Sequence, residues 1–453
     1  MAITIQQQPT SPNMGNAHLL WVVTSNSSSE AQFQYVADVY VSGSSTRVQR
    51  VKQQPNPSAK GVFDLGTIIP TSLDSDNVWK AAPFATSSES NKDFIVKFGE
   101  EYGTSTSSSV VLYDGAGSAG EPNTTGSQFY TITNGLVEPD SGDWNFASSS
   151  YYSGSVTPTG GTGNFTRSSA LSNAPKTQSI QDGEYETVSF YNGNFDASLT
   201  NAQDIYYVQF NVYNAAGSQI QNIGFYNITA NGGGPRTSEA QDWNDMGVYN
   251  GQTNNTRLIH LGVGPQNLAD SGNTLNTAWS YYTVTVVSNE GTGLEDGSAV
   301  WDSFRFNKDT ANCDIPGKRF AWKNEFGVWD YFTFKLTEST VSNLERNSYE
   351  QSFVDYSTST NSVPYSRERR GMSQYYNKVS KQHAVESDYL NQATADAVRE
   401  LFFSTDVYVQ DGTEFVPVVI SNASITEKTN PRAQKLFRYT AEYKYANEVR
   451  PRI

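Results

Sequence analysis

The chain has 453 residues and a formal net charge of −15, with 17% charged and 13% aromatic residues. Residues 1–300 hold 11 basic and 26 acidic residues, whereas residues 301–453 hold 20 of each. Phosphate binding needs clustered cations, so this charge argues against nucleic acid as a partner of the first part. The balanced last third suits either packing against other subunits or an ordinary solvated surface.

Composition also limits the class of protein. Gly, Ser, Thr, Asn and Tyr are abundant and helix formers are few, which favours short strands joined by polar turns. No run of 18 apolar residues occurs, so we expect no membrane insertion. The N-terminus MAITIQQQPTSPNMG lacks the basic and apolar regions of an export signal, and the single cysteine, Cys313, allows no intrachain disulfide. A particle assembled in the host cytoplasm and released by lysis would have these properties.

The first part of the chain reads as a series of strands. Phe33–Gly43 carries apolar residues on both faces, which indicates a central strand. An antiparallel β-sandwich over residues 1–139 is the simplest fold for this pattern. The predicted strands are Leu19–Ser25, Phe33–Gly43, Thr46–Gln54, Phe63–Ile69, Asp93–Gly103 and Ser107–Gly115.

The middle of the chain changes composition and then returns to strands. Residues 140–179 are dominated by Ser, Thr, Gly and Asn and are predicted as a linker or long surface loop. Residues 180–310 are predicted as a second β-sandwich. Asp204–Ala230 forms two of its strands around an Ala-Ala-Gly-Ser turn, and Thr256–Gly264 and Trp279–Ser288 add two more.

The last third, residues 311–453, is predicted as a small α+β domain. Ser387–Ser404 has one apolar stripe and reads as a helix capped by Ser387. A hairpin turning at Asp411–Gly412 follows, and then an alternating strand over Lys435–Ala446. The predicted fold is therefore mainly β, with two antiparallel β-sandwich-like domains followed by a small α+β domain.

Catalytic and metal-binding patterns are weak in this sequence. His18, His260 and His383 lie far apart, whereas a metal site normally shows clustered ligands. The stretch GGGPR lacks the Lys-Ser/Thr of a P-loop. We therefore expect no catalytic residue, no metal and no cofactor, and the chain is predicted not to be an enzyme.

Gly317–Leu336, GKRFAWKNEFGVWDYFTFKL, contains seven aromatic residues in two short strands around the turn KNEFG. Aromatic residues at this density build a core, and Trp, Tyr and Arg also dominate interface hot spots. Both roles are open for this hairpin. The candidate interface residues are Trp322, Phe326, Trp329, Tyr331, Arg367, Arg369 and Arg370.

This hairpin, the RRG of Arg369–Gly371 and the stretches ELFFSTDVYV, VPVVIS and KLFRYTAEYKYA together resemble a pattern in structural proteins of tailed bacteriophages. The resemblance covers about the last third of the chain. It implies a virion component of the tail or its distal apparatus, with other virion proteins as partners. The resemblance implies no catalytic residues. We also expect a homo-oligomer, as a ring or another multimer.

Two alternatives remain open at this point. One is a capsid-attached decoration or fibre protein. The other is a carbohydrate-binding or glycan-cleaving protein that meets a host surface glycan through Trp243, Trp279, Tyr281 or Tyr282, because such enzymes and binders use aromatic platforms beside carboxylates.

Overall fold

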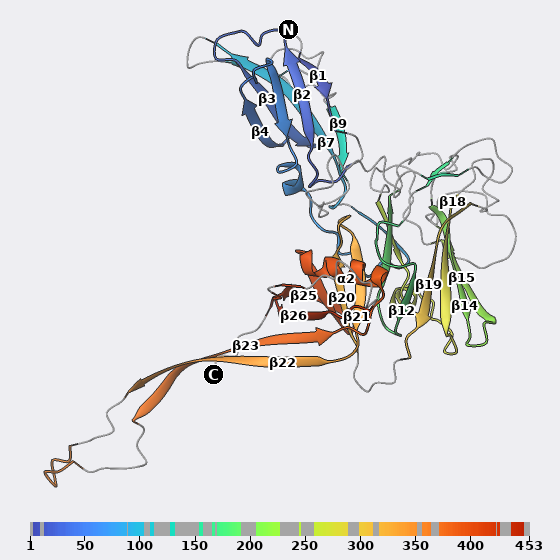
Figure 1. Ribbon diagram of the computed structural model, residues 1–453, viewed down its shortest axis with the longest axis vertical. Coiled ribbons are helices and arrows are strands. Elements are labelled where there is room, and N and C mark those ends of the chain that lie inside the picture. Colours follow the sequence, from blue (N-terminus) through green and yellow to red (C-terminus); the bar gives the residue numbers. More distant parts are fainter. Residues whose placement is uncertain are drawn as a thin grey trace. The chain divides into compact units, whose positions relative to one another are not determined.

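A computed structural model shows a mainly β chain that forms two compact units (Figure 1). The first unit comprises residues 1–312, 322–331 and 396–405, and the second comprises residues 313–321, 332–395 and 406–453. The structure describes residues 3–9, 13–87, 89–103, 109–112, 127–131, 154–156, 165–167, 170–191, 205–226, 244–245, 258–288, 299–310, 317–350, 356–363, 371–422, 424–425 and 436–447.

The predicted fold class, mainly β and rich in sandwich-like sheets, is confirmed. The predicted boundaries at residues 140, 180 and 311 stay predictions. The structure adds that two stretches of the predicted C-terminal domain, Trp322–Tyr331 and Asp396–Thr405, belong to the first unit.

The N-terminal part of the first unit holds a three-stranded sheet, β1-β2-β5, and a five-stranded sheet in which β3 lies between β4 and β7. The predicted central position of this strand is confirmed, since six of its eight residues are buried. Trp21, Tyr35, Phe63 and Phe94 are fully buried in the core of this part. The elements are β1 (Ile3–Gln7), β2 (Leu20–Ser25), β3 (Gln34–Val41), β4 (Arg47–Gln53), β5 (Lys60–Asp64), η1 (Ile69–Ser72), β7 (Lys92–Tyr102), β8 (Ser109–Leu112) and β9 (Ser127–Thr131).

One predicted strand is wrong in this part. Phe63–Ile69 was expected to be extended, but β5 ends at Asp64 and a 3-10 helix, η1, begins at Ile69. Proline near the start of η1 explains the change, because its fixed φ suits the first helical turn and it cannot donate to a sheet ladder.

The rest of the first unit holds a six-stranded sheet, β12-β19-β18-β14-β15-β16, and a three-stranded sheet, β13-β17-β6. The predicted hairpin β14–β15 is confirmed: Asn214 Oδ1 accepts hydrogen bonds from Ala216 and Ser218, and Gly217 has φ +77°. The elements are β6 (Phe84–Thr86), β10 (Gly154–Val156), β11 (Phe165–Arg167), β12 (Thr177–Ile180), β13 (Thr187–Tyr191), β14 (Ile205–Tyr213), β15 (Gln219–Tyr226), β16 (Asn244–Asp245), β17 (Leu258–Gly262), α1 (Pro265–Asp270), β18 (Tyr281–Ser288) and β19 (Ala299–Lys308).

The last part of the chain forms a seven-stranded sheet in the order β21-β20-β24-β25-β26-β23-β22. The predicted aromatic hairpin is confirmed as β20–β21, with Gly327 at φ +76° in its turn, and so is the hairpin β24–β25, with Gly412 at φ +62°. The elements are β20 (Lys318–Lys323), β21 (Trp329–Phe334), β22 (Glu338–Glu350), β23 (Met372–Glu386), α2 (Gln392–Phe403), β24 (Val407–Asp411), β25 (Glu414–Ile420) and β26 (Thr440–Tyr445).

The predicted helix begins later than expected. Ser387 does not cap it, because its Oγ accepts a hydrogen bond from the Tyr439 backbone N–H at 2.9 Å, and Leu390 forms an isolated bridge with Phe437. The helix begins at Gln392, where Asn391 Oδ1 accepts from Thr394 N at 2.9 Å, which is an N-cap.

Candidate functional site

The four aromatic residues predicted as interface anchors are buried within the chain. Trp322, Phe326, Trp329 and Tyr331 are each less than 5% exposed. These side chains are enclosed by their own chain, and their interface role stays a prediction. The core role that the pattern also allowed is confirmed. Arg367, Arg369 and Arg370 lie outside the described residues.

The tip of this hairpin is held by residues of the first unit that lie far away in sequence. Trp329 Nε1 donates to the Asp76 carbonyl at 2.7 Å, and its ring meets Trp79 edge to face, with 5.0 Å between centroids. The Tyr331 and Thr187 hydroxyls are 2.8 Å apart. Trp329 and Tyr331 therefore belong to the framework of the first unit.

Three carboxyl groups gather beside this tip. Asn173 Nδ2 donates to Glu325 Oε1 at 2.5 Å and to Glu400 Oε1 at 2.8 Å, and Glu325 N donates to Glu400 Oε2 at 3.1 Å. Burial raises the pKa of Asp330 to about 6. Burial and the charge of Asp330 raise the pKa of Glu400 to about 8. Among the described residues no group of His, Cys, Asp or Glu is arranged to hold a metal ion.

Three of the four predicted sugar platforms are covered by other side chains. Trp279 and Tyr282 are 3% and 0% exposed, and Trp279 Nε1 donates to Asp182 Oδ1 at 2.8 Å. Tyr281 stacks on Tyr213 at 4.7 Å, and the Arg305 guanidinium carbon lies 3.8 Å from the centre of the same ring. These three residues cannot serve as exposed platforms, and Trp243 lies outside the described residues.

His260 is the one fully buried histidine of the three. Its Nδ1 lies 2.7 Å from Ser189 Oγ on the neighbouring strand, and its Nε2 has no hydrogen-bond partner among the described residues. Burial lowers the pKa of His260 to about 4, so the ring is neutral at physiological pH. The other two histidines pair elsewhere, His18 with Asp64 and His383 with Thr340.

The second unit carries a long, exposed two-stranded hairpin, which sequence reasoning missed. β22 pairs with β23 from Glu338 to Glu350, but β23 pairs with β26 only through His383–Glu386. Residues 341–350 and 372–382, here called the arm, therefore pair only with each other within the described sheet. Ten residues of extended chain are about 33 Å long.

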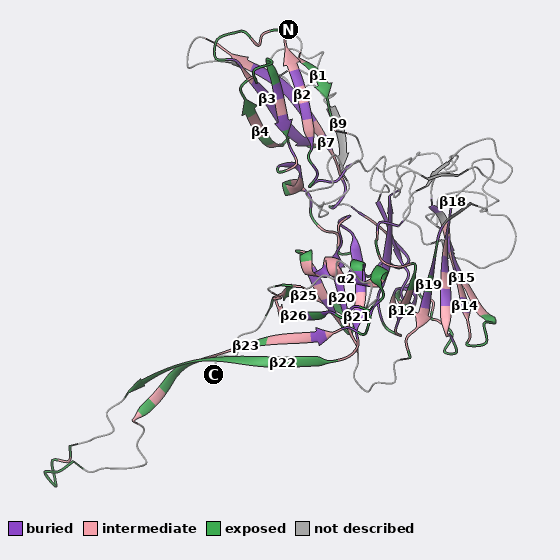
Figure 2. Ribbon diagram, viewed as in Figure 1, coloured by how far each residue is buried: buried purple, intermediate pink, exposed green. Residues whose placement is uncertain are grey.

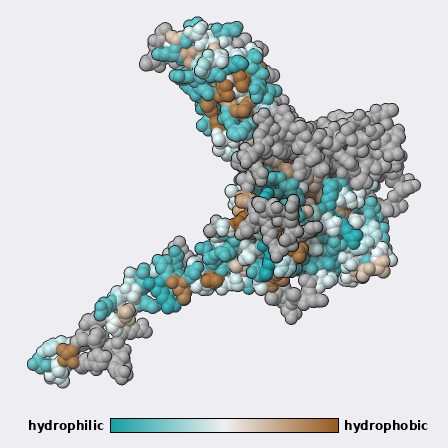
Figure 3. All heavy atoms as spheres, in the orientation of Figure 1, coloured by the Kyte–Doolittle hydropathy of each residue, from teal (hydrophilic) through white to brown (hydrophobic). Residues whose placement is uncertain are grey.

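No residue of the arm is buried, and all 13 residues of β22 are exposed (Figure 2). Apolar side chains nevertheless occur along it (Figure 3). β22 is the last strand of its sheet, so no further described strand lies against its outer edge. The exposed apolar residues of the arm are Val341, Leu344, Tyr349, Met372, Tyr375 and Tyr376.

Comparison with known proteins adds little to this geometry. No family model and no curated protein matches the chain. A solved structure titled "The Bacillus anthracis TIE protein" is similar at 9% identity, over 84% of this chain and 69% of that chain, with a TM-score of 0.12. In the described part of the chain no helix has the length and apolarity that crossing a bilayer requires.

Proposed function

We propose that this chain is a structural component of a phage virion, in the tail or its distal apparatus, and that it assembles through the arm with a second copy of itself. The observation that carries the proposal is the arm: a long pair of strands with no buried residue and with apolar side chains exposed to water. The assignment to a phage tail rests on the resemblance of the last third of the sequence to structural proteins of tailed bacteriophages.

Physical chemistry explains why such an arm needs a partner. A two-stranded hairpin with no packed face is marginally stable in water. The outer edge of β22 is a template to which another strand can add through backbone hydrogen bonds. Without a partner chain, the arm would gain little stability from contacts between its own two strands. The exposed ion pair of Glu345 and Lys378, 3.8 Å apart, is an example of such a weak contact.

Charge favours a second copy as this partner. β22 carries three Glu and one Arg, and β23 carries two Lys and one Glu, so each arm offers both signs to its neighbour. Residues 301–453 hold equal numbers of acidic and basic residues, whereas residues 1–300 carry the whole negative charge. Contact through the C-terminal third therefore avoids the repulsion that two acidic surfaces would cause.

The oligomeric state of the full chain tests the self-assembly step. Light scattering after size exclusion should give a multimer at micromolar concentration. Val341→Lys with Leu344→Lys should give a monomer, because two buried lysines oppose association. The matched control is Val419→Lys, which changes an exposed valine of β25 outside the arm and should leave the multimer intact. A monomeric native chain, or an unchanged multimer in the arm variant, contradicts the proposal.

Immunogold labelling of phage particles purified from cells that express the protein tests its position. Gold on the tail supports the proposal, and gold over the head surface supports a decoration protein. Particles that lack the protein altogether contradict both positions.

A further inference from the structure

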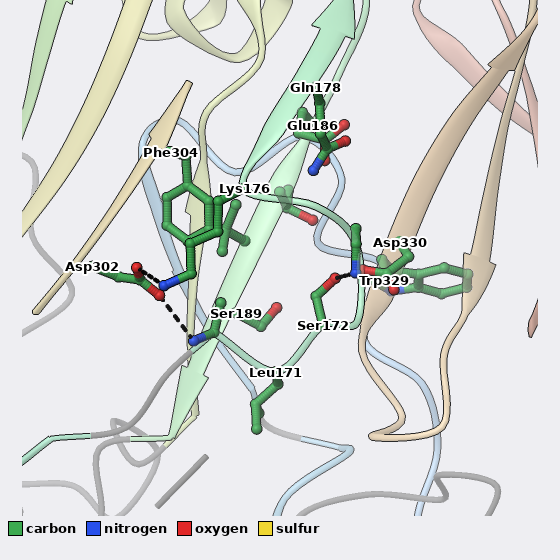
Figure 4. Close-up of a pocket in the computed structure, with 14 residues that line it drawn as sticks. Leu171, Ser172, Lys176, Gln178, Glu186, Ser189, Asp302, Phe304, Trp329 and Asp330 are labelled. Atoms are coloured by element: carbon green, nitrogen blue, oxygen red, sulfur yellow. Dashed lines mark hydrogen bonds and ion pairs between the residues drawn. The ribbon is translucent and has the colours of Figure 1, made fainter. Parts of the chain in front are cut away.

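A cavity of about 220 Å³ lies within the first unit, beside strands β12, β13 and β19 and the first residues of β21 (Figure 4). It shares no residue with the arm. The residues that line it are Ala170, Leu171, Ser172, Ala174, Lys176, Gln178, Glu186, Thr187, Val188, Ser189, Asp302, Phe304, Trp329 and Asp330.

The lining offers hydrogen-bond donors and acceptors together. Figure 4 shows Asp302, paired with Lys176, on one side and Asp330 on the other, with Ser172 and Ser189 between them in this view. The Lys176 side chain is 59% exposed, so one side of this group of residues reaches solvent. Hydroxyl groups and the Gln178 amide can both donate and accept.

The carboxyl group of Asp330 has one oxygen without a hydrogen-bond partner among the described residues. Asp330 is 4% exposed, and hydrogen bonds from Ser172 and Asn324 reach its carboxyl group, but Oδ2 has no partner in the part of the chain that the structure describes. A buried polar atom without a partner is costly, and native structures satisfy nearly all of them. Oδ2 therefore calls for a hydroxyl or N–H donor from outside the described chain.

The remaining walls are apolar, and the volume is small. Leu171, Val188 and Phe304 supply carbon surface beside the polar groups. A cavity of roughly 150 Å³ holds benzene, and one water occupies about 30 Å³ of liquid. A cavity of about 220 Å³ therefore suits one six-membered ring with its substituents, and is too small for a drug-sized ligand.

We infer that this cavity binds a single sugar residue. A pyranose ring presents C–H groups for the apolar walls and hydroxyls that both donate and accept, which matches a lining of mixed polarity. A simple cation would meet the Asp330 carboxylate but would leave the apolar walls of Leu171, Val188 and Phe304 without a partner. This site differs from the platforms Trp279, Tyr281 and Tyr282 expected from the sequence, whose rings are covered by other side chains.

The test is direct binding of monosaccharides to the full chain. The probes are glucose, galactose, mannose and N-acetylglucosamine at up to about 50 mM, detected by saturation-transfer NMR and titration calorimetry. At least one should bind with a Kd on the order of 1 mM, the range expected for about twelve non-hydrogen atoms at ordinary ligand efficiency. Absence of binding by all four overturns the inference.

Variants locate the site. Asp330→Asn keeps the shape but exchanges a carboxylate for an amide, and it should weaken the sugar at least tenfold. Gln178→Ala changes a half-buried lining residue and serves if Asp330→Asn does not fold. The control is Asp182→Asn, a carboxylate of the first unit that bonds Trp279 outside the cavity and should leave affinity unchanged. Equal affinity in both cavity variants overturns the inference. Tighter binding of ethanolamine than of any sugar overturns it too, because the site then selects a cation.

Discussion

Replacing Trp329 with alanine tests whether the tip of the aromatic hairpin is core of the first unit. The side chain is 3% exposed, and removing a buried Trp costs about 3–5 kcal/mol. The hydrogen bond to the Asp76 carbonyl is lost as well, about 1 kcal/mol, and so is the edge-to-face contact with Trp79, about 0.5–1.5 kcal/mol. Because these contributions overlap, we expect a total loss of about 4–6 kcal/mol, against a typical domain stability of about 5–15 kcal/mol.

The assay is urea unfolding of the full chain followed by circular dichroism. Trp329→Phe keeps a ring but removes the Nε1 donor, so it should cost about 1–2 kcal/mol, roughly the hydrogen bond and the change in packing. A double-mutant cycle with Trp79→Ala isolates the contact between the two rings and should give a coupling of about 1 kcal/mol.

Two results would refute this reasoning. A loss below about 1 kcal/mol for Trp329→Ala means that the ring is not packed as described. Full additivity of Trp79→Ala and Trp329→Ala means that the two rings do not stabilise each other, and the tip of the hairpin is then not held by residues 76–79.

The remaining predictions concern titration and helix capping. His260 binds a proton more weakly in the folded chain than in the unfolded chain, so the free energy of unfolding falls as pH drops from 6.5 to about 4. His260→Gln should remove up to about 3 kcal/mol of this loss. Urea unfolding at several pH values across that range measures it. Asp330 and Glu400 have raised pKa values, so their contribution to stability is present at low pH and is lost as pH rises, from 3.8 to about 6 for Asp330 and from 4.5 to about 8 for Glu400. Glu400→Gln should therefore make the chain more stable at pH 8.5 than the native protein, and a variant that is less stable there contradicts the account. Asn391→Ala should destabilise α2 by about 1 kcal/mol, measured by thermal unfolding, and an unchanged melting temperature would mean that another residue caps the helix.

Strands with buried faces were predictable from the sequence. β3 alternates apolar residues and is buried on both faces, and the two strands β14 and β15 flank an Asn-Ala-Ala-Gly-Ser turn. In each case the pattern and the structure agree because side-chain burial imposes a period of two on the sequence.

Contacts across long sequence distances were not predictable. Ser387 reads locally as a helix cap, but residues 387–390 pair with residues 437–439, and that ladder removes them from the helix. Aromatic residues serve cores and interfaces equally well, so composition alone could not assign Trp329. The deciding contacts involve Asp76 and Trp79, about 250 positions away. The residues that line the cavity likewise come from four strands, so no local sequence motif predicts the cavity.

The arm was missed for the opposite reason. β22 reads ESTVSNLERNSYE, which has no sustained apolar alternation, because neither face of the strand is buried. Periodicity reports burial and not extended geometry, so a strand that its own chain leaves uncovered has no signature. Val341 and Tyr349 lie on one face of β22 and Leu344 on the other, so neither face reads as a core face, yet all three are exposed to water. The proposed addition of a strand from a second copy would cover the outer edge of β22 and the apolar side chains beside it, which the chain alone leaves exposed.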